Sequence, residues 1–135
     1  MNPKGFLIFD IDGVIRDVSK SYRRALQETV NYFSGWTPGI NTIDSLKSEG
    51  IWNNDWDASL ELLRRYNSKS KNKIPLPIRK DLIKKFSNYY FGGEINGSSK
   101  KWHGFIKDEE LLVQKDFFTE LSKQNYKWGF FSGAE

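Results

Sequence analysis

The feature that most constrains the fold is a run of apolar residues that ends in two aspartates, in the segment Phe6–Asp17 (FLIFDIDGVIRD). The apolar residues that open it are continuous rather than alternating, which is typical of a strand in a parallel sheet covered on both faces. Asp10 and Asp12 follow, and Gly13 permits a turn that a larger residue would resist. Because a carboxylate at the edge of a core is costly unless it is paired, the segment predicts a metal site, a hydrogen-bonded turn or a catalytic role.

A second buried strand is expected at Lys127–Phe131 (KWGFF), followed by a small polar turn at Ser132. The pattern between the two strands is mostly helical. It predicts helices near residues 19–34, within 37–50, after Asp55 or Asp57, at 78–91 and at 113–123. Parallel strands need a crossover connection, usually a helical one. This crossover is far longer than necessary, which predicts a domain of its own.

The predicted fold class is therefore α/β: a partial Rossmann-like core of parallel strands with an inserted α-helical domain. We expect the core to comprise residues 1–17 and 113–135, and the helical domain to comprise residues 18–112. A chain of 135 residues with 38% hydrophobic and 16% aromatic residues has enough apolar material for such a core.

Composition excludes several classes of function. The net charge is 21 − 17 = +4 and the positive residues are scattered, so nucleic-acid binding is not expected. The absence of cysteine excludes disulfides and thiolate metal sites. No apolar segment is long enough for a signal peptide or a membrane span, which favours a soluble cytoplasmic protein without membrane partners.

Asp10-Ile11-Asp12-Gly13-Val14 after an apolar strand resembles the first motif of the haloacid dehalogenase superfamily. The second motif of that superfamily is an apolar strand ending in Ser or Thr, and WGFFSG supplies one at Ser132. The helical insert looks like the C1 cap of subfamily IA, the phosphoglycolate-phosphatase-like branch. The resemblance covers nearly the whole chain.

The resemblance implies a phosphatase that works through an aspartyl-phosphate. Asp10 would be the nucleophile and Asp12 the general acid and base. Mg²⁺ would bind the Asp10 side chain and the Asp12 carbonyl, and a phosphate oxygen would bind at Ser132 and Gly133. A cap loop at Asn53, Asn54 and Asp55 would help to select the substrate, a small phosphorylated metabolite. Asp12 favours phosphoryl transfer over dehalogenation, because the departure of a halide needs no proton.

The residues also allow plainer interpretations. Asp-x-Asp-Gly can form a turn whose hydrogen bonds satisfy the carboxylates. Ser132 alone would be an ordinary residue at the end of a strand. The residues from Asn53 to Asp55 can be a simple turn and helix cap. His103, the only histidine, is predicted to be a loop residue.

The sequence departs from the family in one respect. Two further motifs of the superfamily, a lysine and an acidic pair that completes the Mg²⁺ site, are not found up to Glu135. We therefore expect an N-terminal portion of a phosphatase, truncated or one half of a split enzyme, inactive until another polypeptide supplies the rest. The alternative is a non-catalytic remnant or binding module.

Overall fold

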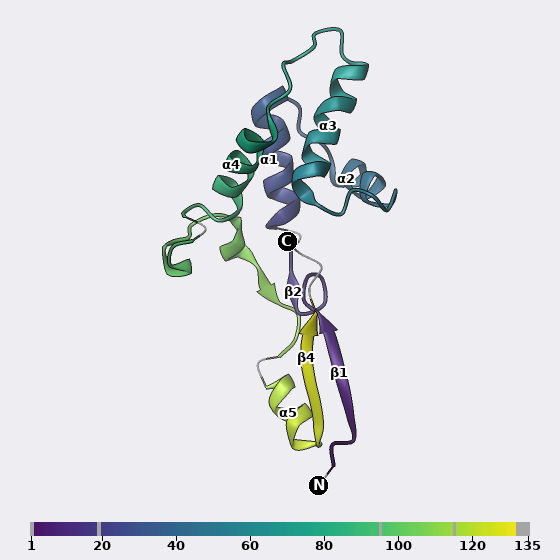
Figure 1. The fold of residues 1–135 in the computed structure, drawn as a ribbon, viewed down its shortest axis with the longest axis vertical. Helices are drawn as coiled ribbons and strands as arrows, with labels where there is room; N and C mark the ends of the chain where they lie inside the picture. The colour runs from purple at the N-terminus through teal and green to yellow at the C-terminus, as the bar shows by residue number, and fades with distance from the viewer. Residues whose placement is uncertain (1, 19, 95, 115, 132–135) are drawn as a thin grey trace. The chain divides into compact units, whose positions relative to one another are not determined.

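The computed structural model describes residues 2–18, 20–94, 96–114 and 116–131 (Figure 1). The chain separates into two compact units. We call residues 1–19 with 109–135 the strand unit and residues 20–108 the helical unit, and each is described by itself.

The strand unit is built on two parallel strands, β1 (Gly5–Asp10) and β4 (Tyr126–Phe131). They pair in register along their whole length, from Gly5 opposite Tyr126 to Asp10 opposite Phe131. This confirms the prediction that the two apolar runs are neighbouring parallel strands. The chain is thus of mixed α/β class, with parallel strands as in part of a Rossmann-like core.

A short helix, α5 (Phe117–Lys123), packs on one face of this pair. The Phe118 ring lies 4.5 Å from the Trp128 ring, 5.3 Å from that of Phe130 and 5.7 Å from that of Phe9, measured between centroids. The helix begins later than the predicted residue 113, because the backbone turns at Gln114, whose carbonyl accepts the Phe117 N–H.

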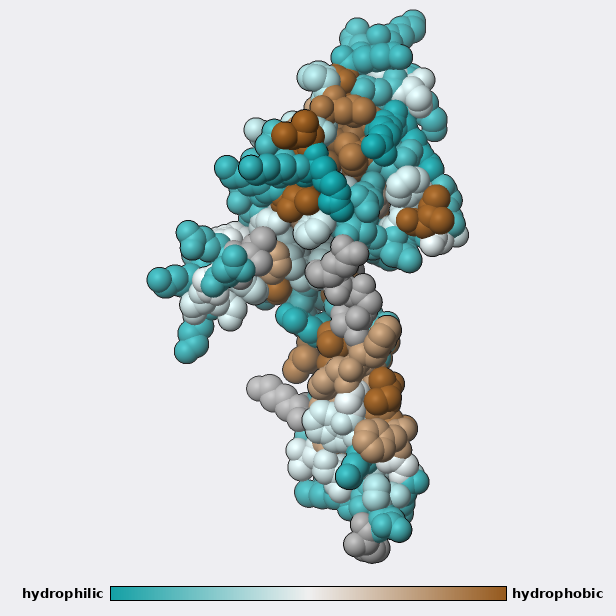
Figure 2. Space-filling view, in the orientation of Figure 1, coloured by the Kyte–Doolittle hydropathy of each residue, from teal (hydrophilic) through white to brown (hydrophobic). Residues whose placement is uncertain are grey.

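The opposite face of the sheet differs from the prediction. The continuous apolar run of β1 predicted a strand covered on both faces, yet exposure alternates along it. Phe6 is 67% exposed and Ile8 63% exposed, while Leu7 and Phe9 between them are half-buried. Figure 2 shows apolar surface along this strand. The run is as apolar as a strand covered on both faces requires, but among the described residues only one face is covered.

A second, antiparallel pair joins β2 (Arg16–Asp17) to β3 (Glu110–Leu111). It is extended by a hydrogen bond from the Leu112 N–H to the Ile15 carbonyl, 2.8 Å long. This pair could not be predicted from the sequence, because two-residue strands are too short to show a periodicity.

The described residues of the helical unit form four α-helices: α1 (Tyr22–Ser34), α2 (Ile40–Lys47), α3 (Asp55–Lys69) and α4 (Arg79–Tyr90). Two 3₁₀ turns follow, η1 (Ser99–Lys101) and η2 (Phe105–Asp108). Helices α1, α3 and α4 pack against one another. The core of the unit, to which α2 contributes Ile43 and Leu46, comprises Ala25, Leu26, Val30, Ile43, Leu46, Ala58, Leu62, Leu63, Leu82, Phe86 and Tyr90.

The sequence explains where these helices begin and end. Helix α1 buries the face that its apolar spacing predicts and ends at Gly35, whose φ of 76° is left-handed. Helix α3 does not begin with Asp55 or Asp57 as its cap. Instead the Asn54 side chain accepts the N–H groups of Trp56 and Asp57, at 2.9 and 3.1 Å.

The loop after α4 is closed by two glycines in direct contact. The Gly104 N–H donates to the Phe91 carbonyl at 2.8 Å. A Cβ added at Gly104 would lie 2.4 Å from the Tyr90 carbonyl oxygen, and one at Gly92 would lie 2.3 Å from the Gly104 nitrogen. Only residues without a side chain fit this approach.

Candidate active site

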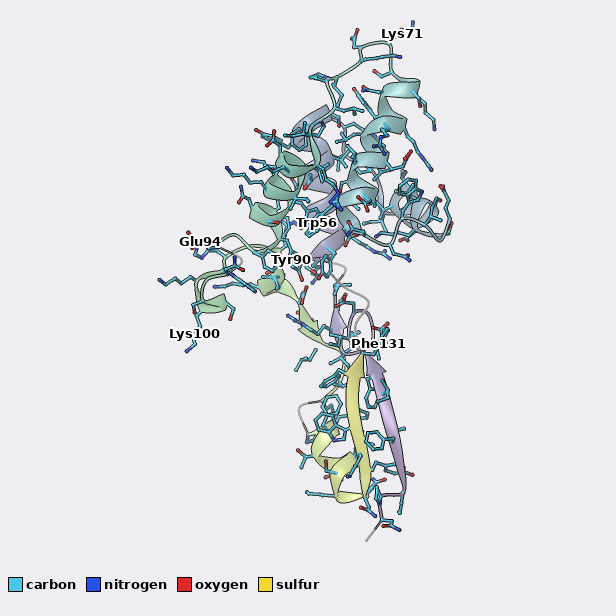
Figure 3. The ribbon with its side chains drawn as sticks, in the orientation of Figure 1. Trp56, Lys71, Tyr90, Glu94, Lys100 and Phe131 are labelled. Carbon is cyan, nitrogen blue, oxygen red and sulfur yellow. The ribbon has the colours of Figure 1, made fainter. Side chains whose placement is uncertain are left out.

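Asp10 is the last residue of β1, at the carboxyl end of a parallel pair of strands. Its partner across the pair is Phe131, which Figure 3 labels at the end of β4. In open α/β sheets ligands bind outside the carboxyl ends of the strands. The strand register therefore puts the exposed Asp10 carboxylate where this class of fold binds its ligands.

The chain turns tightly after Asp10. The Ile11 carbonyl accepts the N–H groups of Ile15 and Arg16 at 2.9 and 3.0 Å, and that of Val14 at 3.3 Å. Gly13 has a φ of 78°, which an L-residue with a side chain rarely adopts, and its N–H donates to the Arg16 carbonyl at 2.8 Å.

This loop brings the two aspartates into one short turn. Asp12 is half-buried and forms a backbone bridge with Arg16. Asp10 accepts the Ile11 N–H on its own side-chain oxygen Oδ1 at 2.8 Å. The loop thus matches part of the plainer interpretation, since it is a turn in which the Asp10 carboxylate accepts a hydrogen bond. The Asp10 side chain nevertheless stays exposed to solvent.

An ion pair that the sequence analysis missed lies beside this loop. The Arg16 guanidinium pairs with the Glu109 carboxylate, whose side chain is 1% exposed. A carboxylate buried to this degree requires a partner, so Arg16 and Glu109 hold the loop against the segment that leads into β3. No local pattern could have predicted the pair, because the two residues are far apart in the sequence.

The proposed phosphate-binding residues Ser132 and Gly133 lie outside the described residues. The last described residue before them is Phe131, opposite Asp10. His103 is an exposed loop residue, as predicted.

The predicted substrate-selecting residues belong to the helical unit. Asn54 is the cap of α3, and the Asp55 carboxylate pairs with the Lys47 ammonium at 2.6 Å. Lys47 also donates to the Asn53 carbonyl at 3.1 Å. These contacts match the turn and cap that the sequence left open as an alternative, and a role in substrate selection stays a prediction.

The donors for a metal ion are few. Within residues 2–18, 20–94, 96–114 and 116–131, no cluster of three or more His, Cys, Asp or Glu side chains is arranged to hold one. Asp10 and the Asp12 carbonyl offer hard oxygen donors, which is the chemistry that Mg²⁺ prefers. They fit part of a Mg²⁺ site, whose remaining ligands would be water, phosphate or other groups.

A cavity of about 620 Å³ lies within the helical unit. It is lined by Trp36, Thr42, Ser45, Leu46, Leu62, Arg65, Tyr66, Lys69 and Ser70. None of the predicted site residues is among them. One of the lining residues, Arg65, donates a hydrogen bond that holds the pKa of Glu49 below its ordinary value.

Among the described helices, none combines the length and the apolar character that crossing a bilayer requires.

Comparison with known proteins gives structural neighbours but no family. No family model matches the sequence. A 62-residue stretch, 46% of this chain, is 39% identical to an imidazoleglycerol-phosphate dehydratase from Phytophthora nicotianae and spans 14% of that protein.

Two solved structures share the fold. Phosphatase Tt82 from Thermococcus thioreducens matches 96% of this chain with a TM-score of 0.71 and 20% identity. CbbY from Rhodobacter sphaeroides, solved in complex with phosphate, matches 98% with a TM-score of 0.58 and 14% identity. The chain spans 63% and 52% of these two proteins. It therefore has a large part of the α/β fold of these two proteins.

Proposed function

We propose that this chain carries the nucleophile and the general acid of a Mg²⁺-dependent phosphatase of the haloacid dehalogenase type. The observation that carries the proposal is the position of Asp10. It ends β1 opposite the end of a parallel neighbour, and a tight glycine turn presents Asp12 two residues later.

The chemistry follows from two carboxyl groups with different tasks. The exposed Asp10 carboxylate attacks phosphorus and forms an aspartyl-phosphate, while the bond from phosphorus to the leaving oxygen breaks. Asp12 gives its proton to that oxygen, which leaves as an alcohol. Asp12 then takes a proton from water, which attacks phosphorus and releases inorganic phosphate and Asp10.

The remaining groups complete the same proposal. The Asp10 carboxylate and the Asp12 carbonyl would hold Mg²⁺, which when bound offsets the negative charge of the phosphate. Ser132 and Gly133, which follow Phe131 in the chain, would bind a phosphate oxygen. The helical unit would act as a C1 cap of the subfamily IA kind over a small phosphorylated metabolite. Further charge-neutralising groups would come from another stretch of polypeptide.

A second candidate is a binding module without catalysis. It is favoured by one observation: the described residues hold no cluster of three or more metal-ligating side chains. Electrostatic stabilisation is usually the largest catalytic term, and a chain without it would retain only part of a pocket.

A fusion protein distinguishes the two candidates. Residues 1–135 are joined to the part of phosphatase Tt82 that has no counterpart in this chain, and circular dichroism verifies that the fusion folds. We expect Mg²⁺-dependent hydrolysis of p-nitrophenyl phosphate. Asp10→Asn reduces it to background because an amide cannot serve as the nucleophile, and Asp12→Asn slows it by about 10²–10⁴.

The matched control is Asp116→Asn. Asp116 is an exposed aspartate of the same unit whose side chain does not cap α5. This variant should keep the parent rate within about twofold, as substitutions away from a site usually do. A folded fusion that hydrolyses equally well with Asp10→Asn would refute the mechanism, and one without any activity would favour the binding module.

A further inference from the structure

One face of the β1–β4 pair is apolar and uncovered. In a parallel pair with this register, alternate residues of both strands share a face. We call this surface the open face; its residues are Phe6, Ile8, Asp10, Lys127, Gly129 and Phe131. Phe6, Ile8 and Phe131 are 67, 63 and 64% exposed.

Parallel sheets are almost always covered on both faces. Here α5 covers the face that carries Phe9 and Trp128, and among the described residues nothing comparable covers the open face. Three large apolar side chains exposed together on one face of a sheet mark a surface that another apolar surface should cover.

The dimensions of the open face match one helix. Two neighbouring strands make a surface about 10 Å wide, which is about the diameter of one α-helix with its side chains. From Phe6 to Asp10 the strand rises about 13 Å, and a helix of about three turns covers that length.

The charges on the open face give such a helix a direction. Lys127 lies at the start of β4 and Asp10 at the end of β1, so the two charges stand at opposite ends of the face. A helix carries partial positive charge at its N-terminus and partial negative charge at its C-terminus. A helix antiparallel to the strands puts its N-terminus beside Asp10 and its C-terminus beside Lys127, so both ends interact favourably. This is also the direction of the helix in a right-handed β–α–β crossover.

Gly129 adds a notch in the middle of the face. A Cβ at this position would meet only Ile8 Cδ1, at an ordinary contact distance of 3.7 Å. The packing of the described residues therefore does not require glycine here. Its missing side chain leaves room for a side chain from outside.

We propose that the open face binds a single amphipathic α-helix of about three turns. The helix belongs to a polypeptide outside residues 1–135 and runs antiparallel to β1 and β4, with its N-terminus beside Asp10. Both structural neighbours contain polypeptide beyond the part that this chain matches, since the chain spans 63% and 52% of them. The proposal does not depend on the catalytic roles of Asp10 and Asp12.

A second copy of the chain fits this surface less well. The three apolar side chains are about two-thirds exposed, so they offer about 400 Å² if a fully exposed side chain of this size offers about 200 Å². Each partner in a stable dimer buries about 800 Å². Each copy also carries a net charge of +4, which opposes association.

The test uses residues 1–135 and a synthetic helical peptide of about twelve residues, stapled because so short a helix is marginal in water. The peptide carries leucines along one face, no acidic residue in its first turn, and a fluorophore. Fluorescence anisotropy should show saturable binding. A peptide of the same composition with its leucines spread around the helix should not bind.

Variants of the open face locate the binding. Ile8→Lys should weaken it at least about tenfold, because a charge replaces a buried apolar side chain. Gly129→Val, which fills the notch and suits a strand, should weaken it about fivefold. The control is Leu111→Lys, the same kind of change at a side chain 56% exposed on β3; its affinity should stay within about twofold. Circular dichroism verifies that all variants fold.

The direction of the helix is tested by cross-linking, because the chain has no cysteine of its own. A peptide with an N-terminal cysteine should form a disulfide with Phe131→Cys and not with Lys127→Cys, and a peptide with a C-terminal cysteine should do the reverse. Equal affinities in Ile8→Lys and the parent chain, or cross-linking in the opposite sense, would overturn the proposal. So would sedimentation that shows a dimer of residues 1–135 which Ile8→Lys dissociates.

Discussion

The two units of this chain bury their large apolar side chains to very different degrees. In the helical unit, Leu26, Ile43 and Leu63 are completely buried, and aromatic rings pack around that core. In the strand unit, Phe6 and Ile8 of β1 remain about two-thirds exposed. The helical insert therefore completes its own core, whereas a pair of parallel strands with one short helix leaves one face uncovered among the described residues.

The reason lies in what each kind of element can bury. Helices α1, α3 and α4 each carry one apolar stripe, and three stripes can face one another. A parallel strand carries apolar residues on two sides, so it needs a covering layer on each. Helix α5 supplies one layer for the strand unit. The open face is where the second is lacking among the described residues.

The largest expected difference in stability is between a substitution in the core of the helical unit and one on the open face of the strand unit. Leu63→Ala should lower the free energy of unfolding of the helical unit by about 2–5 kcal/mol, because it leaves a cavity in a closed core. Ile8→Thr should change the stability of the strand unit by no more than about 0.5 kcal/mol, because Ile8 is exposed and threonine suits a strand. Amide NMR spectra across a urea titration follow each unit separately. Comparable losses at the two positions would mean that the open face is covered in solution.

An intermediate effect is expected at the glycines. Gly104→Ala forces a methyl group against the carbonyl oxygens of Tyr89 and Tyr90, at 2.5 and 2.4 Å, so the backbone must move. The cost to the helical unit should be about 1–3 kcal/mol. Gly129→Ala meets only an ordinary contact and should leave the strand unit unchanged or more stable by about 0.5 kcal/mol. The same titrations measure both variants, and a Gly129→Ala variant that unfolds more readily would show that the notch serves the chain itself.

The smallest effect concerns Glu49 and Arg65 on the surface of the helical unit. The hydrogen bond from Arg65 depresses the pKa of Glu49 in the folded state. A depressed carboxyl pKa stabilises the fold above the unfolded pKa of about 4.3, and this contribution is lost as the pH falls through the folded value. Glu49→Gln should therefore lower the urea midpoint slightly at pH 7 and not at pH 3. A difference of the same size at both pH values would contradict this origin.

Much of the architecture could be predicted because its signals are local. The apolar runs at Phe6–Asp10 and Lys127–Phe131 identified the parallel pair, and the spacing of Leu26 and Val30 identified the buried face of α1. Helix starts were less accurate. Asn54, rather than a neighbouring aspartate, caps α3, since several side chains in that loop can accept the same N–H groups.

The rest could not be predicted because it depends on partners distant in the sequence. The β2–β3 pair and the ion pair between Arg16 and Glu109 join segments on either side of the helical insert. For the site, the strand and its Asp-x-Asp-Gly turn were foreseen, while the three hydrogen bonds to the Ile11 carbonyl were not. Whether β1 is covered on one face or two depends on which elements pack against it, and its apolar run is the same in either case.

Hydrogen exchange on residues 1–135 tests the difference between the two units most directly. Local stability follows the buried contacts of each element. In the free chain, the amides of β1 and β4 should therefore exchange at least about 100-fold faster than those of α1, α3 and α4. Adding the stapled peptide should slow exchange in β1 and β4 alone. Equal protection of the strands and the helices in the free chain would contradict the account.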